Sequence, residues 1–251
     1  MTATLRQADR GRWLRAFRPL PAPRVRLVCL PHAGGAATFF QPWAALMSPG
    51  VELHAVRYPG RQDRLDEPCV EDMDELADAV AAALTPLLDR PLALFGHSMG
   101  AAVAYEVAVR LESRHGFVPR RLLVSGRQAP HLAETEDYSG HSDEELVAEL
   151  RAFGNLDRGA LDVPAIRELL LPAVRADFRL ISAYRPAAPP KVDTGIVGYT
   201  GLSDPGCPID GARAWSQLSR GGFELKVFPG GHFYLAEQRA ALVADLLSRL
   251  L

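Results

Sequence analysis

The chain has 251 residues, of which 48% are hydrophobic and 23% charged, a composition typical of a globular protein with one sizeable core. The formal net charge of −2 and the lack of a dense basic run argue against a nucleic-acid partner. No apolar run is long enough to span a bilayer, and the arginine-rich N-terminus lacks the apolar stretch of a signal peptide. We therefore expect a cytoplasmic protein with no membrane partner.

The cysteines and the basic residues carry little functional signal. Cys29, Cys69 and Cys207 are odd in number and far apart, and they form no CxxC or His/Cys cluster with metal-ligand spacing. We expect free thiols in a reducing compartment and no metal site. Only two of the 28 basic residues are lysines, which we interpret as a coding bias rather than as the mark of a partner.

Short buried-strand patterns alternate with helical patterns along most of the chain. The predicted strands are 25–30, 51–58, 92–95, 121–125, 195–199 and 223–228, and the predicted helices are 72–88, 99–114 and 236–251. Because strands separated by helices form parallel sheets, we predict an α/β fold with a mostly parallel central sheet and helices on both faces.

The segment 131–190 interrupts this alternation, because it has no clear strand pattern. Ser142 and Glu145 predict a capping box at the start of one helix, and Pro164 and Pro172 could each open a further helix. We predict a single domain over 1–251, with a core of about 20–130 and 191–251. The helical insertion of about 131–190 lies beside the expected active-site edge, so we interpret it as a lid rather than as a completion of the core.

The strongest chemical signal is the stretch Gly96-His97-Ser98-Met99-Gly100, a G-x-S-x-G pattern between a predicted strand and a predicted helix. A strand that turns sharply into a helix needs glycines around the turning residue, because the backbone is strained and the two elements pass closely. That geometry would raise the Ser98 hydroxyl out of the sheet at a helix N-terminus. We therefore predict that Ser98 is a nucleophile rather than a structural turn serine.

A serine nucleophile needs a histidine base and an acid that orients it, and in this kind of fold they follow the serine in the order acid, then histidine. His232 fits the base, because it follows a strand end and a glycine-rich turn. Asp204 fits the acid, because it lies just past the strand 195–199; Asp210 is the next competitor and lies farther from that strand. The remaining histidines are less suitably placed: His32, His54, His97, His115, His131 and His141.

The oxyanion formed during acyl transfer needs two backbone N–H donors. One should belong to Met99, the residue after the nucleophile. The other should come from the loop after an early strand, where Pro31-His32-Ala33-Gly34-Gly35 allows a close backbone approach, and we assign it to Ala33. A phosphate loop is disfavoured, because the chain has no P-loop pattern and no G-x-G-x-x-G after a strand.

Five motifs together resemble those of the type II thioesterases, which are stand-alone α/β-hydrolases associated with polyketide and nonribosomal peptide synthases. The motifs are PHAGG at 31–35, YPGR at 58–61, GHSMGA at 96–101, DP at 204–205 and GGHFYL at 230–235. The resemblance runs from about residue 24 to the C-terminus, with no departure at Ser98, Asp204 or His232.

This resemblance implies an editing activity, in which acyl groups that stall a synthase are hydrolysed from the phosphopantetheine thioester of an acyl or peptidyl carrier protein. It also implies a mobile lid over an acyl chamber, and it implies no cofactor beyond the phosphopantetheine that the substrate carries. Carrier proteins are generally acidic, so arginines beside the entrance are candidate contacts: Arg61, Arg127 and Arg179.

Two alternatives stay open at this point. A carboxylesterase, lipase or acyltransferase could use the same scaffold and triad, because the fold alone does not separate these activities. A catalytically silent hydrolase fold could serve as a binding module, although the complete set of Ser98, Asp204 and His232 argues against it.

Overall fold

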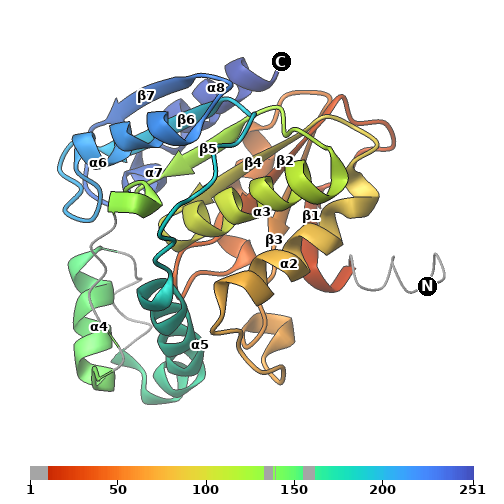
Figure 1. Cartoon of the computed structure of the whole chain (residues 1–251). Helices are drawn as coiled ribbons and strands as arrows, with labels where there is room; N and C mark the ends of the chain where they lie inside the picture. Colours follow the sequence, from red (N-terminus) through yellow and green to blue (C-terminus); the bar gives the residue numbers. More distant parts are fainter. Residues whose placement is uncertain (1–10, 133–137, 139, 155–161) are drawn as a thin grey trace.

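The computed structural model describes residues 11–132, 138, 140–154 and 162–251, and a seven-stranded sheet runs through its centre (Figure 1). The strands are β1 (Leu14–Arg18), β2 (Val25–Leu30), β3 (Val51–Val56), β4 (Leu92–His97), β5 (Leu122–Ser125), β6 (Ile196–Gly201) and β7 (Phe223–Phe228). Their order is β1-β3-β2-β4-β5-β6-β7, and every neighbouring pair is parallel except β1 and β3. The predicted α/β fold with a mostly parallel sheet is confirmed.

The central strands are buried on both faces, which explains their nearly continuous hydrophobic sequences. The register pairs Leu30 of β2 with Gly96 of β4, and His97 of β4 with Ser125 of β5. The carboxyl ends of these parallel strands therefore meet at one edge of the sheet. The loops that follow them carry the sequence motifs described above.

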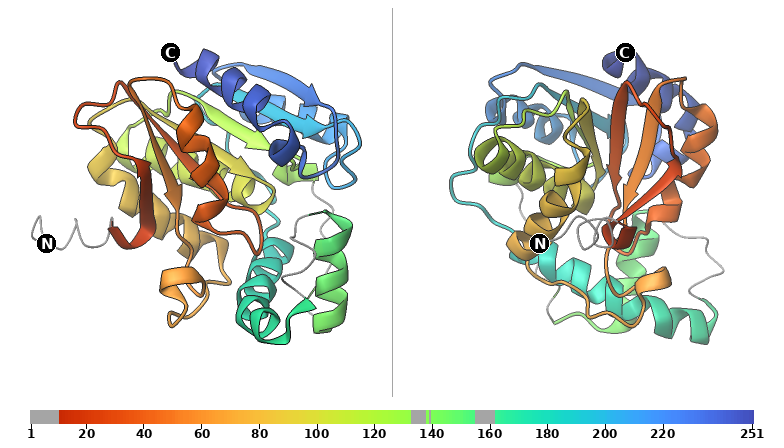
Figure 2. Two further views of the ribbon diagram at one scale, coloured as in Figure 1. Left: turned by 180° about the vertical axis from the view of Figure 1, so that it is seen from behind. Right: turned by 90° about the vertical axis from the view of Figure 1, so that its right-hand side faces the viewer.

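Helices cover both faces of the sheet. The α-helices are α2 (Met73–Leu84), α3 (Met99–His115), α4 (Asp143–Ala152), α5 (Pro164–Ala183), α6 (Ile209–Arg213), α7 (Tyr234–Glu237) and α8 (Arg239–Leu250), and the 3₁₀ helices include η1 (Ala37–Leu46), η3 (Thr85–Leu87), η4 (Pro130–Leu132) and η6 (Ala214–Leu218). The helices α2 and α3 contribute to the hydrophobic cluster on one face, and η1 and α8 to the cluster on the other. Figure 2 shows η1 and α8 on the face turned away from the viewer of Figure 1.

Three element boundaries differ from the prediction. The antiparallel edge strand β1 lies before residue 20, where we expected the core to begin. The helix expected to begin at Pro172 is the second half of α5, which runs through this proline without ending. The predicted last helix is divided at Gln238 into α7 and α8. In α5, burial of Leu171, Val174 and Phe178 offsets the loss of one backbone hydrogen bond, because Pro172 has no N–H to donate.

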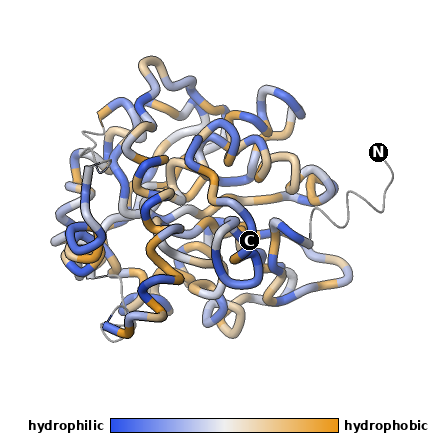
Figure 3. Tube along the Cα trace, turned by 90° about the horizontal axis from the view of Figure 1, so that it is seen from below, coloured by the Kyte–Doolittle hydropathy of each residue, from blue (hydrophilic) through white to orange (hydrophobic). Residues whose placement is uncertain are grey.

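The helices α4 and α5 lie together beyond the carboxyl edge of the sheet (Figure 1), and the predicted capping box of Ser142 and Glu145 starts α4. Their facing sides form a third, smaller hydrophobic cluster, which includes Leu146, Leu150 and Phe178. Figure 3 looks onto the molecule from below, and shows hydrophobic and hydrophilic residues interspersed along the trace. Within the described part of the chain, no helix is both long and apolar enough to cross a membrane.

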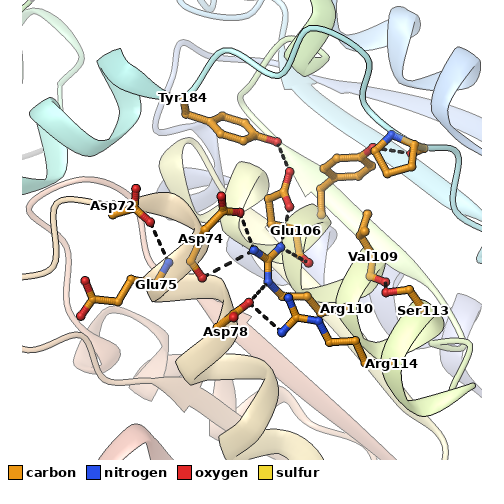
Figure 4. A network of polar contacts seen from close by, with 12 residues as sticks. Asp72, Asp74, Glu75, Asp78, Glu106, Val109, Arg110, Ser113, Arg114 and Tyr184 are labelled. Atoms are coloured by element: carbon orange, nitrogen blue, oxygen red, sulfur yellow. Dashed lines mark hydrogen bonds and ion pairs between the residues drawn. The ribbon is translucent and has the colours of Figure 1, made fainter.

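An ionic network joins α2, α3 and the end of α5 (Figure 4). The buried guanidinium of Arg110 on α3 binds Asp74 and Asp78 of α2 and Glu106 one turn earlier on its own helix. Tyr184 directly follows the last residue of α5, and its hydroxyl donates a hydrogen bond to Glu106 at 2.7 Å. The end of α5 is thus attached to the core at a point away from the loops that carry the motifs.

Candidate active site

Ser98 sits between β4 and α3 with φ 54° and ψ −120°, a left-handed conformation that few non-glycine residues adopt. Its backbone N–H donates to the Ser125 carbonyl at 2.8 Å, which fixes the turn to the neighbouring strand. Added Cβ atoms at Gly96 and Gly100 would lie 2.0 Å from the Gly100 carbonyl oxygen and 2.2 Å from the Leu30 carbonyl oxygen. The two glycines therefore allow the strand, the turn and the helix to pass closely enough to present the serine.

Asp204 and His232 come together from the loops after β6 and β7. The carboxylate lies 2.9 and 3.0 Å from His232 Nδ1 through its two oxygens, and the Gly206 N–H donates to Asp204 Oδ1 at 2.9 Å. Because an ionised carboxylate only accepts hydrogen bonds, Nδ1 carries the proton and Nε2 keeps a lone pair. The competitor Asp210 instead pairs with Arg213 on the surface.

Ser98, His232, Met99 and Ala33 line one cavity of about 300 Å³. The structure thus brings the predicted nucleophile, base and both oxyanion donors to the same space, with Asp204 buried behind the histidine. The rest of the cavity wall comes from the loops after β5 and β6 and from α4 and α5: Arg127, Gln128, Leu150, Phe153, Phe178, Ile181, Pro205 and Gly206, with His32, Tyr138 and Phe233.

A second histidine, His97, lies beneath the site and is fully buried. Its ring centroid is 4.9 Å from that of His232, and its Nδ1 is 2.9 Å from the Ser125 hydroxyl, which in turn is 2.7 Å from the Tyr234 hydroxyl. Burial, together with the neighbouring His232 and His32, holds the pKa of His97 well below its usual value. His97 is therefore neutral at pH 7 and packs against His232 from beneath, and it is not among the residues that line the cavity.

Asp177 on α5 was not among the predicted site residues. Its buried carboxylate accepts two hydrogen bonds from Arg61, at 2.6 and 2.8 Å, and a third from the Gly34 N–H at 2.8 Å. Gly34 follows Ala33 in the predicted oxyanion loop, so α5 is bonded directly to that loop. An acidic residue on the apolar side of α5, between Val174 and Phe178, is the signal that could have identified it.

The three arginines proposed as carrier contacts have different surroundings. Arg61 is buried in its ion pair with Asp177, and is therefore not available to a partner on the surface. Arg179 is exposed and pairs with Glu71. Arg127 lines the cavity beside Ser98.

Among the described residues, no group of three or more histidine, cysteine or acidic side chains is arranged to hold a metal ion.

The strained serine between β4 and α3, the Asp204–His232 pair and the parallel sheet define an α/β-hydrolase. The family model for the thioesterase domain matches residues 25–250, and the chain belongs to this family.

Proteins named as thioesterases match along nearly the whole chain. Thioesterase PikA5 of Streptomyces venezuelae is 42% identical over 254 residues, which cover all of this chain and 90% of that protein. A probable cadicidin biosynthesis thioesterase of Streptomyces griseus is 41% identical, and the match covers 96% of this chain but 66% of the relative. The solved structure of the type II thioesterase BorB, from the borrelidin biosynthetic cluster, superimposes with a TM-score of 0.87 at 44% identity, covering 95% of this chain and 98% of BorB. The predicted resemblance to type II thioesterases is confirmed.

Proposed function

We propose that this protein hydrolyses acyl groups from the phosphopantetheine thioester of acyl or peptidyl carrier proteins, with Ser98 as nucleophile, His232 as general base and Asp204 as the group that orients the base. The observation that carries this proposal is the bond from Asp204 to His232 Nδ1, on a histidine that shares a cavity with the strained Ser98. The chemistry needs no metal and no cofactor other than the arm that the substrate brings.

In the proposed cycle, His232 Nε2 takes the proton of Ser98 as the serine oxygen attacks the acyl carbonyl. The N–H groups of Met99 and Ala33 hold the oxyanion of the tetrahedral intermediate. The C–S bond then breaks as the protonated His232 gives its proton to the sulfur, which leaves with the carrier arm as a thiol, and an acyl-Ser98 ester remains. His232, neutral again, removes a proton from water, which attacks the ester carbonyl. As the ester bond breaks, His232 returns this proton to the Ser98 oxygen, and the acid and the free enzyme are released.

The family supports thioester hydrolysis, and the relatives from biosynthetic clusters support an editing role beside a synthase. The position of α4 and α5 supports a lid, because Leu150, Phe153, Phe178 and Ile181 from these helices or their ends form the apolar wall of the cavity. An acyl chain bound against this wall would place its thioester beside Ser98 while the arm extends outward.

The test is release of the acyl group from an acylated carrier protein, followed by intact mass. We expect the wild-type protein to deacylate the carrier and Ser98→Ala to lose at least about 10⁴-fold in rate, because the nucleophile is removed. Ser113→Ala is the matched control, since Ser113 lies on the exposed side of α3 and bonds only its own helix among the described contacts.

Other outcomes would overturn particular parts of this proposal. If the wild-type protein left the carrier acylated but cleaved a simple oxygen ester, the carrier assignment would be wrong and a carboxylesterase would be the better description. If a serine-directed probe failed to label Ser98 in folded protein, the catalytic role itself would be wrong and a binding module would replace it.

A further inference from the structure

Arg127 is the unusual charged residue of the cavity. It follows Gly126, a glycine with φ 61° at the end of β5, and its carbonyl accepts a hydrogen bond from the buried Trp215 indole at 2.8 Å. An added Cβ at Gly126 would lie 2.5 Å from the His97 ring and 3.3 Å from the His232 ring. The backbone of Arg127 is thus fixed against the catalytic histidine, and its side chain lines the same cavity as Ser98.

Arg127 is half-buried, and two of the three nitrogens of its guanidinium lack both solvent and a counter-charge. Its Nε and Nη2 atoms are inaccessible to solvent and have no hydrogen-bond partner in the described part of the protein. The groups that interact with it electrostatically are Tyr184, Cys207 and Tyr138. Burial raises the pKa of the Cys207 thiol to about 12 and that of the Tyr184 phenol further, so both are neutral at pH 7.

The buried arginines show how this chain ordinarily satisfies such a group. In the described residues, each arginine with less than a tenth of its surface exposed is paired with at least one carboxylate: Arg26 with Glu52, Arg61 with Asp177, Arg64 with Glu67, and Arg110 with Asp74, Asp78 and Glu106. Arg127 is half-buried and has no such carboxylate, because none of the described residues that line its cavity is acidic.

Burial lowers the pKa of Arg127 to about 10, so the guanidinium is still charged at neutral pH. A buried charge with free N–H groups costs free energy until an acceptor reaches it. Arginine N–H groups bind carboxylate oxygens more strongly than neutral acceptors, because the hydrogen bonds are charge-assisted. An oxygen of a ligand bound in the cavity would supply such an acceptor.

We infer that Arg127 is a specificity-determining residue that binds a carboxylate on the acyl group itself, so that the cavity favours acyl thioesters that carry a second, free carboxylate. This inference rests on the proposed thioesterase function and names a substrate class for it. A carboxylate on the acyl side fits better than the phosphate of the arm, because Arg127 lines the cavity that holds Ser98, whereas the arm separates its phosphate from the thioester by a long chain.

The experiment compares two N-acetylcysteamine thioesters of nearly equal shape, glutaryl and 5-methylhexanoyl, which differ in a terminal carboxylate against a terminal isopropyl group. Neither contains phosphate. The measured quantity is the ratio of kcat/KM for glutaryl to that for 5-methylhexanoyl. In Arg127→Met this ratio should fall by between about 10- and 150-fold, the range expected for charge-assisted hydrogen bonds.

Two further variants make the result specific. Arg127→Lys keeps the charge and should retain part of the preference for glutaryl. Arg213→Met removes an exposed arginine from α6 and should leave the ratio at its wild-type value. An unchanged ratio in Arg127→Met would overturn the inference. An effect of Arg127→Met that appears only with phosphopantetheine thioesters, and equally for both acyl groups, would also overturn it and assign Arg127 to the arm phosphate.

Binding to Ser98→Ala separates this inference from the proposed function. Calorimetry with the same two thioesters measures the acyl preference without turnover. If the wild-type protein hydrolysed neither thioester while Ser98→Ala still bound glutaryl more tightly through Arg127, the hydrolase proposal would fail and the carboxylate site would stand. If turnover were normal and this binding preference absent, the hydrolase proposal would stand and the carboxylate site would fail.

Discussion

Ser98 holds a backbone conformation that costs of the order of 1–3 kcal/mol for a residue other than glycine. Close packing around Ser98 maintains this strain, because the backbone at Gly96 and Gly100 lies directly against carbonyl oxygens, one of them that of Leu30. The same local chemistry explains why the site could be read from the sequence. The glycines and the serine lie within one short stretch of chain, and the acid and the histidine each follow the end of a strand, in the order expected for this kind of fold.

Arg127 and Asp177 could not be assigned in that way. Their roles depend on what surrounds them: Asp177 contacts Arg61 and Gly34, which lie more than a hundred residues earlier, and Arg127 is distinguished by the lack of a carboxylate near it. Arg61, Arg127 and Arg179 were predicted together as carrier contacts, because arginines suit an acidic carrier protein. Only the three-dimensional contacts separate a structural ion pair from an unpaired charge in the cavity.

His97 predicts a pH dependence of stability. The unfolded chain takes up a proton on this histidine below about pH 6.5, whereas the folded protein, in which its pKa is well lower, does not. The free energy of unfolding should therefore fall as the pH drops below about 6.5, by up to about 1.4 kcal/mol per pH unit from this residue. Urea unfolding from pH 8 to pH 5 measures the slope.

In this series, His97→Gln should show a shallower loss of stability at low pH than the wild-type protein, whatever its stability at pH 8. His115→Gln is the control, because His115 is exposed at the end of α3 and should leave the slope as it is. Equal slopes for His97→Gln and the wild-type protein would show that His97 is not the source of the acid sensitivity.

At the scale of elements, α5 is held to the core at two places. Its middle is bonded through Asp177 to Arg61 and Gly34, and Tyr184 at its end is bonded to Glu106. The pattern of apolar residues predicted helical structure here, but it did not predict one helix of 20 residues. Proline usually ends a helix, and the packing that carries α5 through Pro172 comes from α4, which no local pattern reveals.

Asp177→Asn should lower the free energy of unfolding by about 3–5 kcal/mol, because it leaves the buried Arg61 without its counter-charge. Glu71→Gln provides a matched control. It removes the exposed partner of Arg179, which lies on α5 like Asp177, and should cost less than about 1 kcal/mol. Denaturant unfolding of the three proteins checks this difference. Similar losses for the two variants would contradict the importance of the buried pair.

At the scale of the whole molecule, the sequence predicted the class of fold but not its full arrangement. Alternating strand and helix patterns gave the parallel sheet, because each central strand is buried and hydrophobic on both faces. The edge strand β1 was missed, since its exposed and half-buried residues give no continuous apolar run. The order of the strands depends on pairings between distant segments, which periodicity does not encode.

The helices α4 and α5 share a hydrophobic cluster of their own, separate from the two clusters on the faces of the sheet. We therefore predict that these two helices can open locally while the sheet stays folded. Leu146→Ala, in the small cluster between these helices, should speed amide exchange in α4 and α5 while β4 and α3 keep their protection. Leu94→Ala, at a buried position of β4, should instead lower global stability by about 2–5 kcal/mol. Hydrogen exchange read by mass spectrometry distinguishes the two patterns, and uniform acceleration in Leu146→Ala would contradict the separation.

Asp177 joins α5 to the loop after β2 through a single carboxylate, so the helix and the loop cannot move apart without breaking that bond. An acyl chain too bulky to fit beneath α5 would displace the carboxylate from the Gly34 N–H as it entered. Such a chain would be attached to the arm at the site yet would react slowly, because the adjoining Ala33 N–H, which we propose as an oxyanion donor, would no longer be held in place. The size of the bound chain would then set the time before hydrolysis as well as the strength of binding, because breaking the bond to Asp177 costs free energy. A short stalled residue would be removed quickly, and a long intermediate in productive use would have time to leave.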